Sequence, residues 1–266
     1  MRLAKEKRSF FGEYEMLQKV RFLNSNAIKF IAAFAMLVDH VGYMFFDDLV
    51  WRIIGRIAMP LFAFAIAEGC HYTKNKLKHF LMLFGLAVMC QAVYFIFDPT
   101  ATLYSILFTF SFATLIIYAM QYFKKSCFAK DGIHIAISFI LFAASIGFTY
   151  WFCKNHEVDY GFWGCMMPVF AALLDFRKFE NIPKWLETVQ TLPVRVLIFG
   201  VAMLLMILSQ ERNLFYPVMW YHFIGLALLF LYNGKKGKLR TKYFFYVFYP
   251  AHLAILEGIW QLVYVL

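Results

Sequence analysis

Charged residues are scarce in this chain of 266 residues. They make up 16% of it, whereas 62% of the residues are hydrophobic and 21% are aromatic. Soluble domains carry about a quarter charged and about half apolar residues, so this composition argues against a soluble enzyme. A disordered chain is also excluded, because there is ample apolar surface to bury. The composition is typical of an integral membrane protein.

Cysteine patterns and leader signals are also lacking. The five cysteines show neither metal-ligand spacing nor the even number of a disulfide framework, so we expect buried or lipid-facing thiols. Residues 1–26 are polar and basic and do not follow the pattern of a cleavable signal peptide. We expect them to form a cytoplasmic segment, either a short helix on the membrane surface or a disordered tail.

The chain instead contains long apolar segments separated by short basic clusters. This pattern predicts an all-α polytopic membrane helix bundle of about nine transmembrane helices, with residues 27–266 as a single transmembrane domain. Segment 51–69 contains Arg56 and Pro60, so we expect it to be kinked or partly unwound. The apolar segments cover residues 27–46, 51–69, 80–97, 103–123, 133–153, 161–175, 194–209, 214–232 and 243–265.

The basic residues favour one orientation in the membrane. With a cytoplasmic N-terminus, 22 of the 26 Lys and Arg residues fall on the cytoplasmic side, and the opposite loops hold only Arg52, Lys154 and Arg212. Because positive charge accumulates in cytoplasmic loops, the N-terminus is predicted inside and the C-terminus outside. The net charge of +10 is thus interpreted as loop charge, and no nucleic-acid partner is expected. We find no convincing internal repeat, which weakens an inverted-repeat transporter interpretation.

Ionisable side chains within the spans are costly and usually face a cavity or a partner. The first span contains Asp39 and His40, and Lys29 lies eleven residues before His40. Eleven residues turn about 1100°, close to three full turns, so Lys29 and His40 share a face about 16 Å apart in height. The same arithmetic places Asp39, His40, His222 and His252 in one layer near the middle of the membrane.

Two further layers are predicted outside this one. Arg56 and Glu257 lie just beyond it, and Lys29 and Glu68 lie near the cytoplasm. Several interpretations of these groups remain open. Arg56 is either a functional cation or a structural counter-ion for Asp39 or Glu257, and a lone histidine such as His222 is often only a hydrogen bond between helices.

Two blocks near the N-terminus, within residues 26–42 and 55–73, and two later motifs, at 159–161 and 249–253, resemble the TraX family. The resemblance covers most of the chain and is strongest in the first 75 residues. The first block consists of residues 26–29 (Asn-Ala-Ile-Lys) and 35–42 (Ala-Met-Leu-Val-Asp-His-Val-Gly). The second consists of 55–64 (Gly-Arg-Ile-Ala-Met-Pro-Leu-Phe-Ala-Phe), 68–69 (Glu-Gly) and 71–73 (His-Tyr-Thr). The later motifs are 159–161 (Asp-Tyr-Gly) and 249–253 (Tyr-Pro-Ala-His-Leu).

The resemblance implies an acyltransferase of a bacterial plasma membrane. The family is named for a conjugation protein that acetylates the N-terminus of pilin. It is related to a superfamily that O-acetylates surface polysaccharides and lipids, in which a basic residue precedes a histidine by eleven positions. Lys29 and His40 match that spacing, with lysine in place of the usual arginine, which keeps the charge but loses bidentate phosphate geometry. The expected partners are the lipid bilayer, acetyl-CoA or another acyl-CoA as co-substrate, and a glycan, lipid, small amine or protein N-terminus as acceptor.

Roles for individual residues follow from the chemistry of acyl transfer from a thioester. His40 is the candidate general base, oriented by Asp39 or another acid, with His252 or His222 assisting. Arg56 is a candidate electrostatic stabiliser. The donor site is assigned to four residues near the cytoplasm, Lys29, Glu68, His71 and Lys74. We expect Lys29 and the cluster Lys74, Lys76 and Lys78 to attract the phosphates of coenzyme A.

Two other functions compete with acyl transfer. A proton-coupled transporter would use the same Asp, His, Glu and Arg groups in mid-membrane. A metal site built from His40, His222 and His252 is less favoured, because no two of them have close helical spacing, and no metal ligand is assigned.

Overall fold

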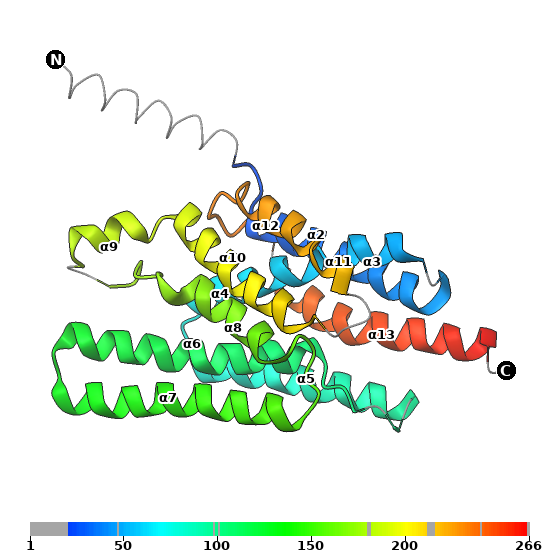
Figure 1. The fold of residues 1–266 in the computed structure, drawn as a ribbon, viewed down its shortest axis with the longest axis horizontal. Helices are drawn as coiled ribbons and strands as arrows, with labels where there is room; N and C mark the ends of the chain where they lie inside the picture. Colours follow the sequence, from blue (N-terminus) through cyan, green and yellow to red (C-terminus); the bar gives the residue numbers. More distant parts are fainter. Residues whose placement is uncertain are drawn as a thin grey trace, which may run out of the picture.

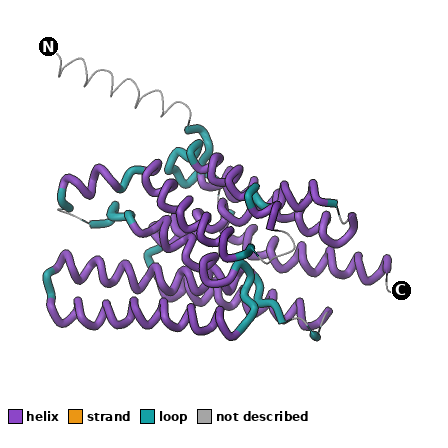
Figure 2. The backbone as a smooth tube through the Cα atoms, viewed as in Figure 1, coloured by secondary structure: helices purple, strands orange, loops and turns teal. Residues whose placement is uncertain are grey.

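The computed structural model describes residues 21–46, 48–97, 99–100, 102–179, 182–211, 216–239 and 241–264. Over this part of the chain the fold is helical, and the β pairing consists of two isolated bridges, Leu23–Tyr232 and Tyr104–Val158 (Figure 2). The predicted all-α membrane helix bundle is confirmed. The surface helix or tail predicted for residues 1–26 falls largely outside the described residues.

The helices follow the expected apolar segments closely. Asn24 caps the first of them, since its side chain accepts hydrogen bonds from the backbone N–H groups of Asn26 and Ala27, both at 3.0 Å. In chain order the elements are α2 (Ser25–Val41), the π-helical turn η1 (Gly42–Phe46), α3 (Leu49–Gly55), α4 (Ala58–Tyr72), α5 (Lys76–Phe97), α6 (Ile106–Ala129), α7 (Gly132–Asn155), α8 (Gly161–Leu173), α9 (Lys184–Val189), α10 (Leu192–Ser209), α11 (Tyr216–Met219), α12 (His222–Leu229) and α13 (Lys242–Tyr264).

Six helical segments within the described residues are long and apolar enough to cross a membrane. Two shorter apolar segments, Gly161–Leu173 and Tyr216–Leu229, fall below that length. Helix α13 has 23 residues, about 35 Å at 1.5 Å per residue. Each of the nine expected segments therefore corresponds to a helical one, while the count of nine spans and the cytoplasmic N-terminus stay predictions. The six segments are Ser25–Phe46, Leu49–Tyr72, Lys76–Phe97, Ile106–Ala129, Gly132–Asn155 and Leu192–Ser209.

The second segment is interrupted between α3 and α4, as its sequence predicts. Helix α3 ends at Gly55 and α4 begins at Ala58. Pro60 has no backbone N–H and cannot donate to the carbonyl of Arg56, which removes the hydrogen bond that would continue the helix. Helix α12 approaches this break closely, since a Cβ at Gly225 would lie 2.5 Å from Pro60 Cγ.

The helices lie side by side, most of them along the long axis of the molecule (Figure 1). Helix α8 is central and packs against α4, α6 and α10, while α2 contacts α3 and α4, and α13 contacts α5. Helix α7 packs on α6 at the edge of the bundle and exposes large apolar side chains, among them Ile133, Ile140 and Trp151. Such an apolar outer face is expected where lipid, rather than water, surrounds the helices.

Candidate functional site

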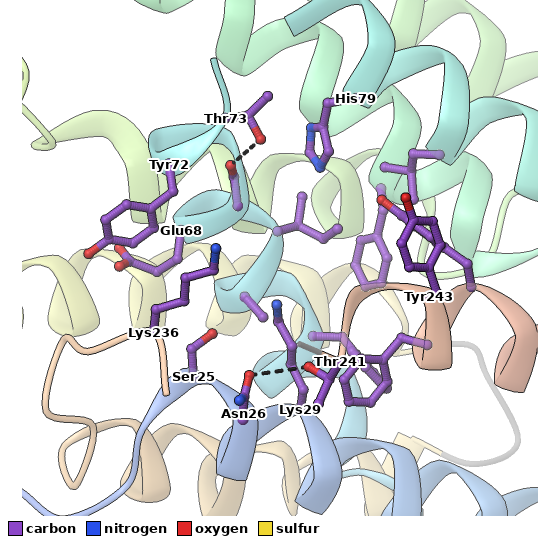
Figure 3. A pocket seen from close by; sticks show the side chains of 18 of the residues that line it. Ser25, Asn26, Lys29, Glu68, Tyr72, Thr73, His79, Lys236, Thr241 and Tyr243 are labelled. Carbon is purple, nitrogen blue, oxygen red and sulfur yellow. Dashed lines mark hydrogen bonds between the residues drawn. The ribbon is translucent and has the colours of Figure 1, made fainter. Parts of the chain in front are cut away.

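A cavity of about 820 Å³ lies among α2, α4, α5 and α13 (Figure 3). Five lysines line it, and we call it the lysine cavity. In Figure 3, Lys29 and Lys236 point into it from one side and His79 from the opposite side. The lysines come from α2 (Lys29), from the turn before α5 (Lys74), from the start of α5 (Lys78), and from the loop between α12 and α13 (Lys236, Lys238).

The lysine cavity extends along α2 and α13 toward a pair of histidines. Its lining includes Met36, one helical turn before His40 on α2, and Phe248, one turn before His252 on α13. The ring of Phe248 stacks on that of His252 with centroids 5.0 Å apart. The cavity therefore runs from a basic region to within one helical turn of both histidines.

His40 and His252 are in direct contact, 212 positions apart in sequence. His40 Nδ1 lies 2.9 Å from His252 Nε2, and the rings are nearly parallel with centroids 5.0 Å apart. His252 Nδ1 lies 2.9 Å from the Phe248 carbonyl oxygen. A carbonyl only accepts, so His252 Nδ1 carries the hydrogen and, in the neutral ring, His252 Nε2 is the acceptor. His40 Nδ1–H then donates to it, which leaves the lone pair of neutral His40 on Nε2.

The partner of His40 Nδ1 is thus His252, where the sequence predicts Asp39 or another acid. Asp39 contacts two arginines instead, with Arg52 Nη1 at 2.9 Å and Arg56 Nη2 at 3.5 Å. Helix α3 reaches Asp39 through Gly55, since a Cβ there would lie 2.1 Å from Asp39 Oδ1. Of the alternatives left open for Arg56, the ion pair with Asp39 is present, and Arg52 adds a second cation to it.

Tyr160 completes this group, which we call the arginine cluster (Asp39, Arg52, Arg56 and Tyr160). The Tyr160 hydroxyl accepts a hydrogen bond from Arg56 Nη1 at 3.2 Å. Tyr160 has a backbone φ of 61° and Gly161 one of 59°, and a left-handed conformation is costly for tyrosine. A Cβ at Gly164 would lie 2.5 Å from Tyr160 Cβ. Both features hold the tyrosine side chain in the position that meets Arg56.

His222 is buried behind the arginine cluster, with an exposed fraction of 0%. Its Nδ1–H donates to the Met219 carbonyl oxygen, and its ring meets that of Tyr160 edge-on with centroids 5.7 Å apart. Nε2 has no hydrogen-bond partner among the described residues. Within the same residues, no group of three or more His, Cys, Asp or Glu side chains is arranged to hold a metal ion.

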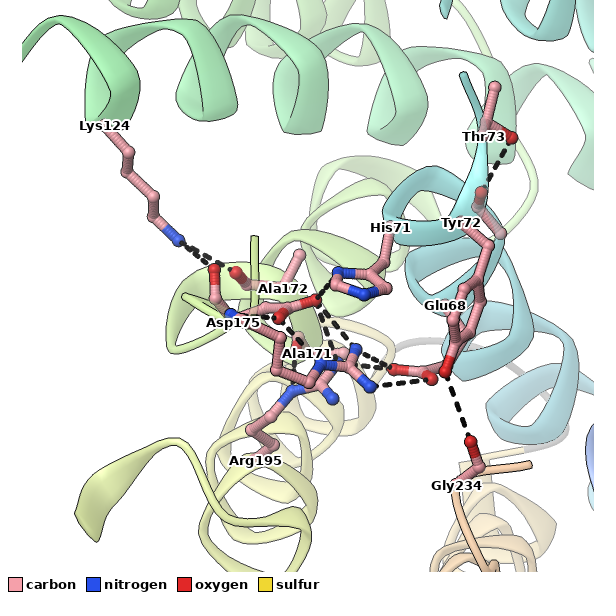
Figure 4. A network of polar contacts seen from close by, with 12 residues as sticks. Glu68, His71, Tyr72, Thr73, Lys124, Ala171, Ala172, Asp175, Arg195 and Gly234 are labelled. Carbon is pink, nitrogen blue, oxygen red and sulfur yellow. Dashed lines mark hydrogen bonds and ion pairs between the residues drawn. The ribbon is translucent and has the colours of Figure 1, made fainter. Parts of the chain in front are cut away.

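Glu68 belongs to a second polar group, an ion-pair network beside the lysine cavity (Figure 4). Its carboxylate accepts hydrogen bonds from Arg177 Nη2 at 2.7 Å and Arg195 Nη2 at 2.8 Å. Glu68 and Arg195 are almost fully buried, with exposed fractions of 3% and 2%. Arg177 also pairs with Asp175 at 2.8 Å. The network joins α4 to α10 and to the loop after α8.

His71 also contacts this network, with Nδ1 2.9 Å from Asp175 Oδ2. Burial raises the pKa of the Asp175 carboxyl, but hydrogen bonds from Arg177 and His71 and the charge of Arg195 more than offset it, so the pKa lies far below its usual value. Burial conversely lowers the pKa of the Arg177 guanidinium, and Asp175 and Glu68 raise it above its usual value.

The predicted donor-site residues therefore divide into two groups. Lys29 and Lys74 line the lysine cavity. Glu68 lines it as well, but its carboxylate is already paired with two arginines, and His71 pairs with Asp175 outside the lining. Their role in binding a donor stays a prediction.

Several residues of these groups were not singled out by the sequence. Arg52 and Arg56 are four positions apart in the sequence, a spacing that puts two side chains on one helix face. This spacing could have predicted that Arg52 joins Arg56 at the site. Tyr160 lies within the Asp-Tyr-Gly motif at 159–161, but the sequence assigns it no role. The sequence counts Arg177, Arg195, Lys236 and Lys238 only as loop charges, and no local pattern marks Asp175.

Comparison with known proteins identifies one matching family and two relatives. The family model described as TraX protein matches residues 24–260. The chain is 27% identical over 245 residues to a protein of Dichelobacter nodosus named "Probable fimbrial assembly protein FimC, serogroup H1", covering 86% of this chain and 92% of that one. It is 30% identical over 135 residues to "Uncharacterized protein RP591" of Rickettsia prowazekii (strain Madrid E), half of this chain and 49% of that one.

No solved structure matches the chain. The family match begins just before α2, ends within α13, and contains the lysine cavity, the histidine pair and the arginine cluster. The protein therefore belongs to the TraX family.

Proposed function

We propose that this protein is a membrane acyltransferase that moves an acetyl or other acyl group from acyl-CoA to a hydroxyl or amine acceptor. One observation carries the proposal: the lysine cavity joins a cluster of cations to the vicinity of the His40–His252 pair. Coenzyme A has the matching polarity, with phosphates at one end and a thioester at the end of a long arm. We place the lysine end in the cytoplasm of a bacterial cell, where acyl-CoA is made.

The histidine pair supplies the base in this scheme. As the acceptor oxygen or nitrogen bonds to the thioester carbonyl carbon, His40 Nε2 takes the acceptor's proton. The C–S bond then breaks, and the departing thiolate takes that proton from His40. In between, His40 is an imidazolium whose Nδ1–H donates to His252 Nε2, and hydrogen bonds from charged donors are stronger than neutral ones.

The arginine cluster supplies positive charge next to the base. Arg52 and Arg56 both contact the carboxylate of Asp39, the residue before His40, so the positive charge of two guanidinium groups lies near the base. Such a charge favours an acceptor or transition state that carries negative charge, as the thioester oxygen does during attack. Asp39 in turn holds the two arginines beside the α2 helix.

The family and its relatives suggest one acceptor class. The relative from Dichelobacter nodosus is named a probable fimbrial assembly protein, and the TraX family takes its name from a pilin acetylase. The N-terminus of a pilin-like protein is therefore the first acceptor to test. A surface glycan, a lipid and a small amine are the others.

Transfer is tested with purified protein in lipid nanodiscs and radiolabelled acetyl-CoA. The expected result is thiol release, together with a mass increase of one acetyl group on one species in a cell extract. Comparing lipids, glycans and proteins of cells with and without this gene identifies that species. If no thiol is released with any extract, and proton uptake accompanies movement of a solute instead, the same buried charges belong to a proton-coupled transporter.

A further inference from the structure

The loop between α12 and α13 is fixed to the start of α2. Asn26 Nδ2 donates to the Leu239 carbonyl oxygen at 2.9 Å, and the Thr241 hydroxyl donates to Asn26 Oδ1 at 3.2 Å (Figure 3). The Ser25 backbone N–H donates to the Lys235 carbonyl oxygen at 2.8 Å. We call residues 233–239 and 241 the clamp loop.

Two lysines of the clamp loop line the lysine cavity on either side of a constrained glycine. Gly237 has a φ of 81°, where a residue with a side chain is strained. An added Cβ would also lie 2.8 Å from Asn26 Nδ2. The turn therefore holds Lys236 and Lys238 at the cavity through geometry that only glycine satisfies.

The clamp loop is also tied to the end of α4, which forms another wall of the cavity. The Tyr72 hydroxyl at the end of α4 donates to the Gly234 carbonyl oxygen at 3.2 Å. Lys236 thus faces the cavity together with Lys29 of α2 (Figure 3). Binding needs little reordering of a loop that is already fixed, which favours affinity.

The charges that line the cavity are unbalanced. Among the described lining residues, Glu68 is the one carboxylate, against five lysines. Its charge is already met by Arg177 and Arg195. A site with several lysines and no free anion is suited to a ligand with more than one phosphate group.

From this arrangement we infer that the clamp loop binds the phosphates of the donor's nucleotide through Lys236 and Lys238. The loop thereby selects coenzyme A thioesters over thioesters carried on pantetheine alone. The inference rests on the proposed function for the identity of the donor. The phosphate site itself depends only on the cavity and its lysines.

Steady-state transfer by the full-length protein in nanodiscs tests the selection. The double variant Lys236→Ala/Lys238→Ala should raise the KM for acetyl-CoA at least about tenfold and leave the kinetics with S-acetyl-pantetheine unchanged. The charge-preserving Lys236→Arg/Lys238→Arg should stay within a few-fold of the wild type. Lys235→Ala is the matched control, because Lys235 is on the same loop but does not line the lysine cavity. A KM no higher than that of the control, or an equal effect on S-acetyl-pantetheine, overturns the inference.

Equilibrium binding of adenosine 3′,5′-diphosphate separates this inference from the proposed function. In zwitterionic nanodiscs the wild type should bind this nucleotide, and the double alanine variant should bind it at least about tenfold more weakly. Lysine-dependent binding without acetyl transfer keeps the phosphate site and refutes the proposed function. Acetyl transfer with a KM that depends on neither lysine supports the proposed function and overturns this inference. Failure to bind the nucleotide, with capture of anionic lipid by the same lysines, makes this a lipid headgroup site and overturns the inference.

Discussion

Replacing His252 measures how much the histidine pair contributes to transfer. His252 Nε2 accepts the hydrogen bond from His40 Nδ1 at 2.9 Å. A neutral hydrogen bond contributes about 0.5–1.5 kcal/mol and one from a charged donor about 1.5–3 kcal/mol. The imidazolium state of His40 therefore loses about 1–2 kcal/mol more than the neutral state when the acceptor is removed. His252→Ala should lower kcat roughly 5–30-fold.

The assay is single-turnover acetyl transfer by protein in nanodiscs, with expression and thermal unfolding measured alongside. His252→Gln should recover part of the lost rate, because its amide oxygen can also accept from His40 Nδ1. His134→Ala is the control, since that histidine is exposed and contacts Asp131 instead. If His252→Ala slows transfer more than His40→Ala, the order of donor and acceptor in the pair is reversed. His252 is then the base and the reasoning is refuted.

Three other perturbations have distinct outcomes. Glu68→Gln should lower the stability in detergent by roughly 3–5 kcal/mol, because it removes the carboxylate nearest to the buried Arg195, at 2.8 Å. A raised KM for the donor with unchanged thermal unfolding would assign Glu68 to the donor site instead. Asp175 has a folded-state pKa below its ordinary 3.8, so the stability from its ion pairs should be constant from neutral pH down to about pH 4 and be lost as the pH falls further. If the free energy of unfolding instead fell between pH 8 and 6, and Asp175→Asn abolished that fall, the predicted direction of the pH dependence would be wrong. Gly55→Ala places a Cβ 2.1 Å from Asp39 Oδ1, so it should cost about 1–3 kcal/mol through overpacking and reduce transfer; unchanged unfolding and activity would show that α2 and α3 can separate at no cost.

Position along a helix was predictable from the sequence, because helix geometry converts residue number into rise. Lys29 was expected near one surface and His40 about 16 Å further along the same face. The structure has Lys29 lining the cavity and His40 one turn beyond its lining. The break at Arg56 was predictable for a similar reason, since the effect of Pro60 on a helix is local.

Lateral contacts were not predictable, because they depend on which helices become neighbours. Depth put His40 and His252 in one layer, but only the packing of α13 against α2 brings their rings together. The charge pattern places Arg52 in an outer loop, whereas it lies in α3 and pairs with Asp39. The same pattern includes Arg195 among the cytoplasmic charges that set orientation, but Arg195 is buried with Glu68.

The central claim is that His40 is the base for acyl transfer, and one measurement addresses it directly. Radiolabelled acetyl-CoA is mixed in a single turnover with nanodisc-embedded wild type or His40→Ala and with the acceptor found in cell extracts. General-base assistance is worth about 10²–10⁴ in rate, so the variant should transfer label at least about a hundredfold more slowly. Its thermal unfolding and its binding of adenosine 3′,5′-diphosphate should match those of the wild type. Transfer by His40→Ala within a few-fold of the wild-type rate would contradict the account.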